Sequence, residues 1–163
     1  MKKLIVLALC LLVTVSGAFA TDMVVGGGLL FHNITDDYGN SESGPGIFGF
    51  FGPNQFLELN AGISFYSVEG YDFKTFQVGI YGKYPIPLSD MLVVFPTGGI
   101  DYEMPLGDDL EGYLLWFRGG AGLDIFFSEK LFVRSHVILG YAMGDYGSGF
   151  GYLAKVGIGF MLD

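Results

Sequence analysis

The chain has 163 residues, of which 51% are hydrophobic, 17% aromatic and only 15% charged, with 27 glycines and a formal net charge of −9. A soluble protein carries about 25% charged residues, so this composition excludes an ordinary soluble surface, and the length accommodates one domain. The acidic balance makes nucleic acid an unsuitable partner.

The first twenty residues have the pattern of a secretory signal peptide. Two lysines precede an apolar run over residues 4–15, and Ala18-Phe19-Ala20 supplies a small-x-small cleavage site. We expect cleavage after Ala20, leaving a mature domain over residues 21–163. Cys10 is the only cysteine. It lies within the apolar run, which argues against a lipid anchor at this position, and its removal leaves no disulfide.

Runs of alternating apolar and polar residues follow in the mature chain. Six of them cover residues 23–32, 45–52, 56–67, 73–84, 91–103 and 150–162, and two more lie within 113–143, joined by the turn Ser128-Glu129-Lys130. Successive side chains of a strand face opposite sides, so each run predicts a strand with one apolar face. The runs at 113–143 are long enough to cross a bilayer, which takes about 9–11 tilted residues. Pro85 to Asp90 predicts a turn, and Pro96 predicts a local bulge.

The predicted fold is all-β: an eight-stranded antiparallel up-and-down transmembrane β-barrel. The apolar faces carry large side chains, whereas the polar faces are rich in glycine and small polar residues. An eight-stranded barrel has little interior room, so we expect small residues inside and large ones facing lipid, the reverse of a lipocalin-like soluble barrel. A helical membrane protein is not expected, because the mature chain has no apolar run of transmembrane-helix length.

The predicted connections alternate in length. Compact ones at 53–55, 85–90 and 128–130 alternate with longer, more acidic ones within 34–44, 68–72, 104–112 and 144–148. Short periplasmic turns and longer outer loops are typical of bacterial outer-membrane barrels, and this assignment places both termini in the periplasm.

The signal peptide and the eight amphipathic strands resemble the small outer-membrane barrels of the OmpA-transmembrane, OmpX and OmpW type. The hairpin formed by residues 115–124 and 130–134 is also similar to one that recurs in bacterial β-barrel domains. This resemblance implies a location in the bacterial outer membrane, contact with its lipid and with the barrel-insertion machinery, and no cofactor. Such barrels commonly end in an aromatic residue, whereas this chain continues past Phe160 for three residues.

The polar faces predict a set of charged side chains in the lumen. Its members are Glu58, Lys83, Asp101, Arg118, Asp124, Arg134, His136 and Lys155. They could form a selectivity constriction, because charged rings in a pore select ions. They could instead form an ion-paired plug, because buried charges persist when they are paired, and the narrow bore favours this interpretation.

Other candidate residues lie near the strand ends. His32 is expected at the rim, near Asp36 and Asp37, where a hydrolase or acyltransferase site would need a serine nucleophile that no motif supplies. The two histidines are too dispersed for a metal site. The predicted acidic outer loops carry Asp36, Asp37, Glu42, Asp108, Asp109 and Glu111, which could concentrate cations or form a solvated surface. The predicted interfacial aromatics are Tyr84, Tyr102, Tyr113 and Tyr141.

These patterns predict a membrane barrel that is not an enzyme. It would be a narrow porin-like channel or a surface-exposed protein with a largely plugged lumen, contacting a small solute or an extracellular ligand. The alternatives are a structural or adhesin-type protein without conductance and, less favoured, a lipid-modifying enzyme.

Overall fold

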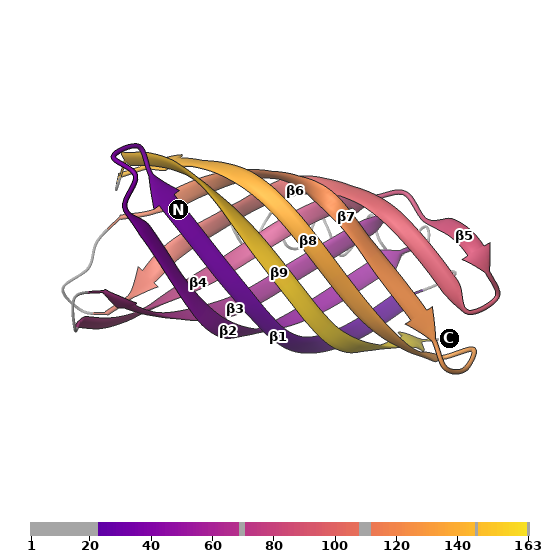
Figure 1. Ribbon diagram of the computed structural model, residues 1–163. Coiled ribbons are helices and arrows are strands. Elements are labelled where there is room, and N and C mark those ends of the chain that lie inside the picture. The colour runs from indigo at the N-terminus through magenta and orange to yellow at the C-terminus, as the bar shows by residue number, and fades with distance from the viewer. Residues whose placement is uncertain (1–22, 69–70, 108–111, 146, 163) are drawn as a thin grey trace, which may run out of the picture.

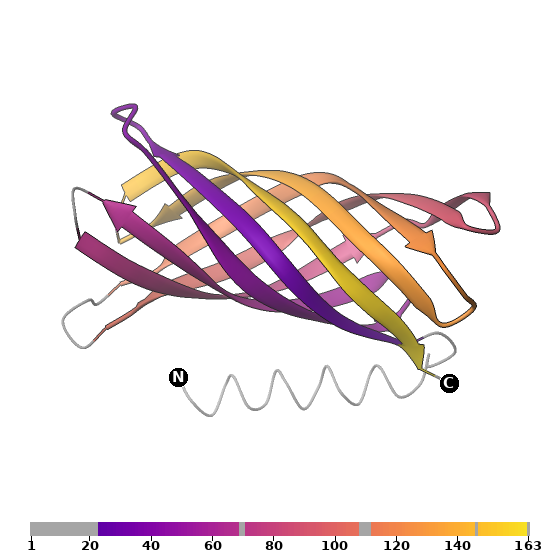
Figure 2. The ribbon, with the colours of Figure 1, turned by 60° about the horizontal axis from the view of Figure 1, so that its bottom comes forward.

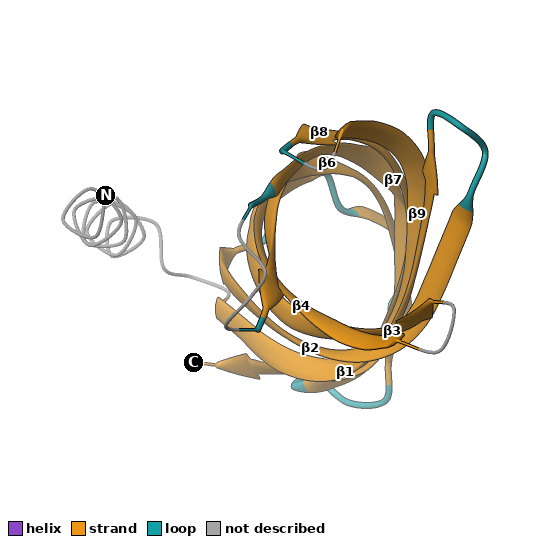
Figure 3. Cartoon of the chain, turned by 90° about the vertical axis from the view of Figure 1, so that its left-hand side faces the viewer, coloured by secondary structure: helices purple, strands orange, loops and turns teal. Residues whose placement is uncertain are grey.

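The computed structural model describes residues 23–68, 71–107, 112–145 and 147–162, which form a closed antiparallel barrel (Figure 1 and, along its axis, Figure 3). The strands are β1 (Met23–Asp36), β2 (Ser41–Asn54), β3 (Leu57–Val68), β4 (Tyr71–Lys83), β5 (Ile86–Ser89), β6 (Leu92–Leu106), β7 (Leu114–Phe126), β8 (Leu131–Gly144) and β9 (Gly147–Leu162). Among the described residues, no helix is long and apolar enough to cross a membrane.

Eight long strands close the barrel, which confirms the predicted fold class. The sheet order is β4-β3-β2-β1-β9-β8-β7-β6-β5, and an additional pairing of β4 with β6 completes the ring. This pairing runs from Lys74 opposite Leu106 to Lys83 opposite Thr97. We call the end that carries Met23, Leu162 and the connection after Asn54 the turn end, and the opposite end the mouth end (Figure 2).

The turn predicted at residues 85–90 is wrong in part, because Ile86–Ser89 forms the short strand β5. Ile86 lies opposite Val94, so β5 continues the hairpin with β6 after a break at residues 84 and 85. The bulge predicted at Pro96 is also wrong, since Pro96 lies opposite Ala121 in an unshifted register. The carbonyl of Pro96 accepts a hydrogen bond from the Tyr84 amide, so the backbone of Pro96 faces the break between β4 and β5 and not β7. The N–H that proline lacks therefore removes no hydrogen bond from the pairing of β6 with β7.

The connections at the mouth end are shorter than predicted. The loop expected over residues 34–44 is reduced to residues 37–40, and the one expected over 144–148 is reduced to two residues between β8 and β9. The Asp36 carboxylate accepts hydrogen bonds from the amides of Tyr38 at 2.9 Å and Asn40 at 2.8 Å, and Gly39 has a φ of 86°. These contacts close a tight turn, so β1 continues to Asp36 and β2 begins at Ser41 through residues that are polar. Loop length therefore does not distinguish the two ends as expected.

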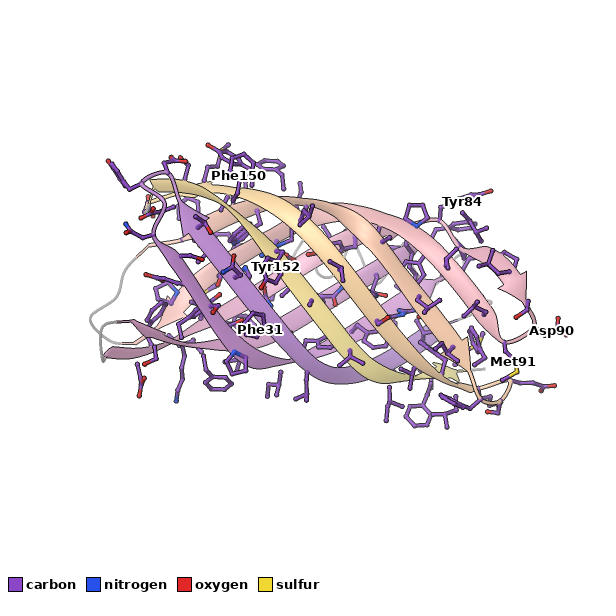
Figure 4. All side chains as sticks on the ribbon, viewed as in Figure 1. Phe31, Tyr84, Asp90, Met91, Phe150 and Tyr152 are labelled. Atoms are coloured by element: carbon purple, nitrogen blue, oxygen red, sulfur yellow. The ribbon has the colours of Figure 1, made fainter. Side chains whose placement is uncertain are left out.

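Large apolar side chains cover the outside of the barrel (Figure 4). Those with at least half of their surface exposed include Leu29, Ile47, Val137, Leu139, Phe150, Val156 and Ile158. The same strands direct their polar and glycine positions inward. A contiguous apolar surface of this extent is typical of a protein that contacts lipid rather than water.

The inside is not restricted to small residues, and that expectation is wrong. The aromatic residues with buried side chains are Phe48, Phe50, Tyr66, Tyr81, Phe95, Trp116 and Phe132. Glycines on neighbouring strands provide the space for these rings. A Cβ on Gly122 would lie 2.3 Å from the Phe95 ring, and one on Gly159 would lie 2.3 Å from the Phe132 ring. Each ring covers the glycine opposite it, so small and large residues together line the inside of the barrel.

Candidate functional site

The structure directs all eight predicted lumen residues inward. Seven of them are buried residues, Lys83 is half-buried with a side chain that is 5% exposed, and Asp101, Arg134 and Glu58 are 2% exposed or less. Glu103, which the sequence analysis did not include, is a further buried carboxylate. Among the described residues, these four lysines and arginines and four carboxylates have balanced formal charges when both histidines are neutral.

Arg134 is the centre of the charge cluster nearest the turn end. Its Nε and Nη2 donate to the two oxygens of Asp124 at 2.6 and 2.5 Å, and its Nη1 donates to Glu58. Glu58 also accepts from the Lys83 ammonium at 3.1 Å. The guanidinium lies 4.8 Å from the centre of the Phe50 ring. This fork-shaped pairing satisfies the buried charges, and aromatic rings pack against the guanidinium.

A second cluster lies halfway along the barrel. The Nε of Arg118 is 2.5 Å from an oxygen of Asp101, which also accepts a hydrogen bond from the Tyr81 hydroxyl. The Lys155 ammonium donates to the Asn60 side-chain carbonyl at 3.1 Å and lies 5.3 Å from the centre of the Tyr81 ring. Lys155 thus has neutral partners rather than a carboxylate within ion-pair distance among the described residues.

His32 is part of the third cluster, towards the mouth end, and the prediction that it lies at the rim is wrong. Inward parity on β1 buries its ring completely, below the turn that holds Asp36. Its Nε2 is 2.9 Å from Arg118 Nη2, and its Nδ1 contacts the Tyr66 hydroxyl. Arginine offers only donors, so Nε2 is the acceptor and Nδ1 carries the proton of a neutral imidazole.

Glu103 lies beside this histidine and has only neutral hydrogen-bond partners. It accepts from Thr75 Oγ1 and from the Trp116 indole, both at 2.6 Å, and from the Tyr66 hydroxyl at 3.5 Å. The His32 Nδ1 is 3.7 Å away. No lysine or arginine nitrogen among the described residues lies within ion-pair distance of Glu103. Its burial could have been inferred from its parity with Asp101 on the same strand.

His136 makes no hydrogen bond through Nε2 among the described residues, and its ring packs edge-on against Phe95 at 5.1 Å between centres. Its inward position follows the predicted parity. Among the described residues, no group of three or more histidine, cysteine or acidic side chains could hold a metal ion.

Above Glu103 the barrel opens into a cavity of about 610 Å³, which we call the vestibule. Its carboxylates are Asp36, Glu42, Asp72 and Glu103. Its apolar and aromatic lining consists of Ile34, Tyr66, Phe73, Met104, Pro105 and Leu114. The rings of Tyr66 and Phe73 stack with centres 5.0 Å apart. No lysine or arginine is among the described lining residues.

The predicted acidic residues divide between the vestibule and parts outside the described residues. Asp36 and Glu42 line the vestibule, Asp37 is exposed in the neighbouring turn, and Asp108, Asp109 and Glu111 lie outside the described residues. The hydrogen bond from the Asn40 side chain lowers the pKa of Asp36. Partial burial, followed by the charge of Asp36, raises the pKa of Glu42.

The four predicted interfacial tyrosines fall at both ends of the barrel. Tyr84 lies at the turn end, where its ring is 6.5 Å from that of Phe56. Tyr102 stacks on Tyr113 at 5.5 Å towards the mouth end. Tyr141 packs against Phe150 at 4.9 Å on the same half of the barrel. Aromatic rings at both ends are typical of membrane interfaces.

No family model and no curated protein sequence matches this chain. Solved structures match it over most of its length. Neisserial surface protein A is 12% identical with a TM-score of 0.63, covering 85% of this chain and 96% of its own. The N-terminal barrel domain of Pseudomonas aeruginosa OprF is 16% identical with a TM-score of 0.54, covering 86% and 97%. Ail of Yersinia pestis, in complex with sucrose octasulfate, is 10% identical with a TM-score of 0.52, covering 86% and 98%. The chain therefore has the fold of the small eight-stranded outer-membrane β-barrels.

Proposed function

We propose that this chain is a bacterial outer-membrane barrel with a closed lumen and a ligand-accessible mouth at the cell surface. The signal-like segment ending at Ala20, the apolar exterior and the fold support this location. Both described termini lie at the turn end, which would face the periplasm. The single observation that carries the closed lumen is the buried ion pair between Arg134 and Glu58, whose strands β8 and β3 lie on opposite walls of the bore.

The two arginines would close the bore because each reaches from its own hairpin to a distant strand. Arg134 of β8 joins Asp124 of the adjacent β7 to Glu58 of the distant β3. Arg118 of β7 contacts Asp101 of the adjacent β6 and His32 of β1 on the far side. Moving a hydrated ion through the bore would require breaking these contacts, and separating a buried pair costs about 3–5 kcal/mol.

The test is single-channel conductance of the refolded mature chain in planar bilayers, together with its unfolding midpoint. We expect no steady conductance from the unmodified protein. Arg118→Ala leaves Asp101 uncompensated and empties space in the bore, so stability should fall and conductance should appear. Lys74→Ala is the matched control, because Lys74 is an exposed cation on β4, 5.9 Å from the Phe65 ring centre. An Arg118→Ala variant unchanged in both readouts would refute a plug that includes Arg118.

A porin-like channel is the second candidate, and one observation favours it. The side chain of Gln77, the hydroxyl of Ser64 and Nη1 of Arg118 are buried without hydrogen-bond partners among the described residues. Buried polar groups of this kind are usually satisfied by water, so water would penetrate between the clusters. Steady conductance of the unmodified protein would favour the channel over the plug.

A binding role fits the site better than catalysis. Both ring nitrogens of His32 are engaged, one by Arg118 and one by Tyr66, so neither is positioned to activate a nucleophile. The Ail structure contains the polyanionic heparin analogue sucrose octasulfate. The acidic vestibule of this chain would repel such a ligand, so its partner would have a different charge.

A further inference from the structure

We propose that the vestibule binds an amphiphilic amine: a ligand with a protonated amino group, which would contact Glu103, and an aliphatic body lying against Tyr66 and Phe73. This rests on the ligand-accessible mouth of the proposed function and names the chemical class of its ligand. The cavity volume of about 610 Å³ falls within the range of roughly 300–1,000 Å³ usual for small-molecule sites.

The floor of the vestibule selects for a cation. Glu103 is 4% exposed and lies at the base of the cavity, yet its contacts come from Thr75, Trp116, Tyr66 and His32 rather than from a lysine or arginine among the described residues. A buried carboxylate is stable when a positive charge balances it. The rim adds Asp36, Glu42 and Asp72 and no described cationic side chain, so the whole cavity attracts positive charge.

An N–H donor fits the floor better than a cation without hydrogens. Gln77 lies directly opposite Glu103 in the pairing of β4 with β6, with its side chain 4% exposed. Neither its carbonyl oxygen nor its amide nitrogen has a hydrogen-bond partner among the described residues. Gln77 is not among the residues that line the vestibule, so the floor contact of a primary ammonium would be to the Glu103 carboxylate, through one of its three N–H donors.

The walls of the vestibule fit the aliphatic body. Tyr66 and Phe73 stack with an interplanar angle of 14°, so they form a continuous aromatic surface beside the floor. Ile34, Met104 and Leu114 add apolar side chains above it. An alkyl chain would bury its surface here, and the aromatic faces would also favour the nearby positive charge.

Trp116 gives a direct assay for binding. It is the only tryptophan in the chain, and its indole donates to Glu103. Hexylammonium added to the mature chain refolded in lipid vesicles should therefore change the Trp116 fluorescence with a saturable dose dependence. Hexanol and hexanoate carry the same six-carbon chain without the positive charge, and we expect each to bind at least about tenfold more weakly, because charge-assisted hydrogen bonds are the strong ones.

Variants distinguish the contributions that the vestibule floor, its aromatic walls and the general surface charge make to hexylammonium binding. Glu103→Gln and Glu42→Gln should each weaken hexylammonium binding, the first by about tenfold or more. Phe73→Leu should weaken it by a few fold. Glu129→Gln is the matched control, since it removes one exposed carboxylate at the turn end. If Glu103→Gln fails to fold, Glu42→Gln still tests the proposal, measured by calorimetry.

Two outcomes would overturn the inference. Equal affinity for hexylammonium and hexanol would show that the cavity binds alkyl chains without regard to charge. Unchanged hexylammonium affinity in both folded carboxylate variants would place the bound amine outside the vestibule. Neither outcome bears on conductance, so failure here is distinguishable from failure of the closed-lumen proposal.

Discussion

Substitution of Arg134 by methionine tests the paired lumen most directly. Methionine retains much of the side-chain volume but removes three hydrogen bonds to carboxylates, two to Asp124 and one to Glu58. Glu58 keeps Lys83 at 3.1 Å, so Asp124 is the group left without compensation. Breaking a buried pair costs about 3–5 kcal/mol, and we expect the free energy of unfolding to fall by that amount, with water entry moving the value towards the lower limit.

The assay is urea unfolding in lipid vesicles, carried out as a double-mutant cycle with Asp124→Asn. Neutralising Asp124 removes the unpaired charge that the methionine creates, so the double variant should be more stable than the two single losses predict. Coupling of about 0.5–3 kcal/mol is usual for residues in contact. A loss below about 1 kcal/mol for Arg134→Met, together with additive single effects, would refute the pairing and indicate a water-filled bore.

Three further predictions concern orientation, lipid contact and packing. Single cysteines at Asp37 and Asp145 should react with an impermeant maleimide on intact cells, and those at Asn54 and Ser89 should not; the reverse pattern would invert the barrel. Arginine at Val137 or Leu139, which are 60% and 64% exposed, should destabilise the protein by about 2–4 kcal/mol in vesicle refolding titrations if they lie near the bilayer midplane, and no loss at either would contradict lipid contact. Gly28→Ala places a Cβ 2.1 Å from the Val156 carbonyl oxygen and should cost about 1–3 kcal/mol in unfolding experiments, whereas Gly49→Ala meets its nearest atom at 3.7 Å and should be tolerated; equal effects would contradict the inward packing.

The alternation of side chains predicts the number of long strands and the face on which each residue lies. Arg134 and His136 alternate with Val133 and Val137, and no other arrangement buries the apolar positions against lipid. Cross-barrel contacts are different, because the pairing of Arg134 with Glu58 depends on the stagger of strands that are not neighbours. Parity alone contains no information about that stagger.

The depth of His32 in the barrel, beside the vestibule floor, is likewise not contained in the local sequence pattern. His32 follows an apolar run and precedes acidic residues, so its sequence context indicates a rim position, whereas β1 in fact continues to Asp36. The hydrogen bonds of the Asp36 carboxylate close the turn after β1, so the strand extends four residues beyond His32 and His32 lies inside the barrel. The inward aromatics cannot be predicted from one strand at a time, because the space for each ring is provided by a glycine on a neighbouring strand. The space for the Phe95 ring comes from Gly122 on another strand.

The sequence separation of the lumen contacts constrains how the chain can enter a bilayer. Glu58 and Arg134 are 76 residues apart, His32 and Arg118 are 86, and Asn60 and Lys155 are 95. A partly assembled sheet would keep the ion pairs between neighbouring strands, such as Arg134 with Asp124 and Arg118 with Asp101, but would lack these cross-barrel partners. It would therefore expose incompletely satisfied polar groups to hydrocarbon. Stepwise insertion of single hairpins is accordingly unfavourable. The favourable route brings the first and last thirds of residues 23–162 together before the barrel crosses the membrane core. Assembly should therefore be slow and concerted.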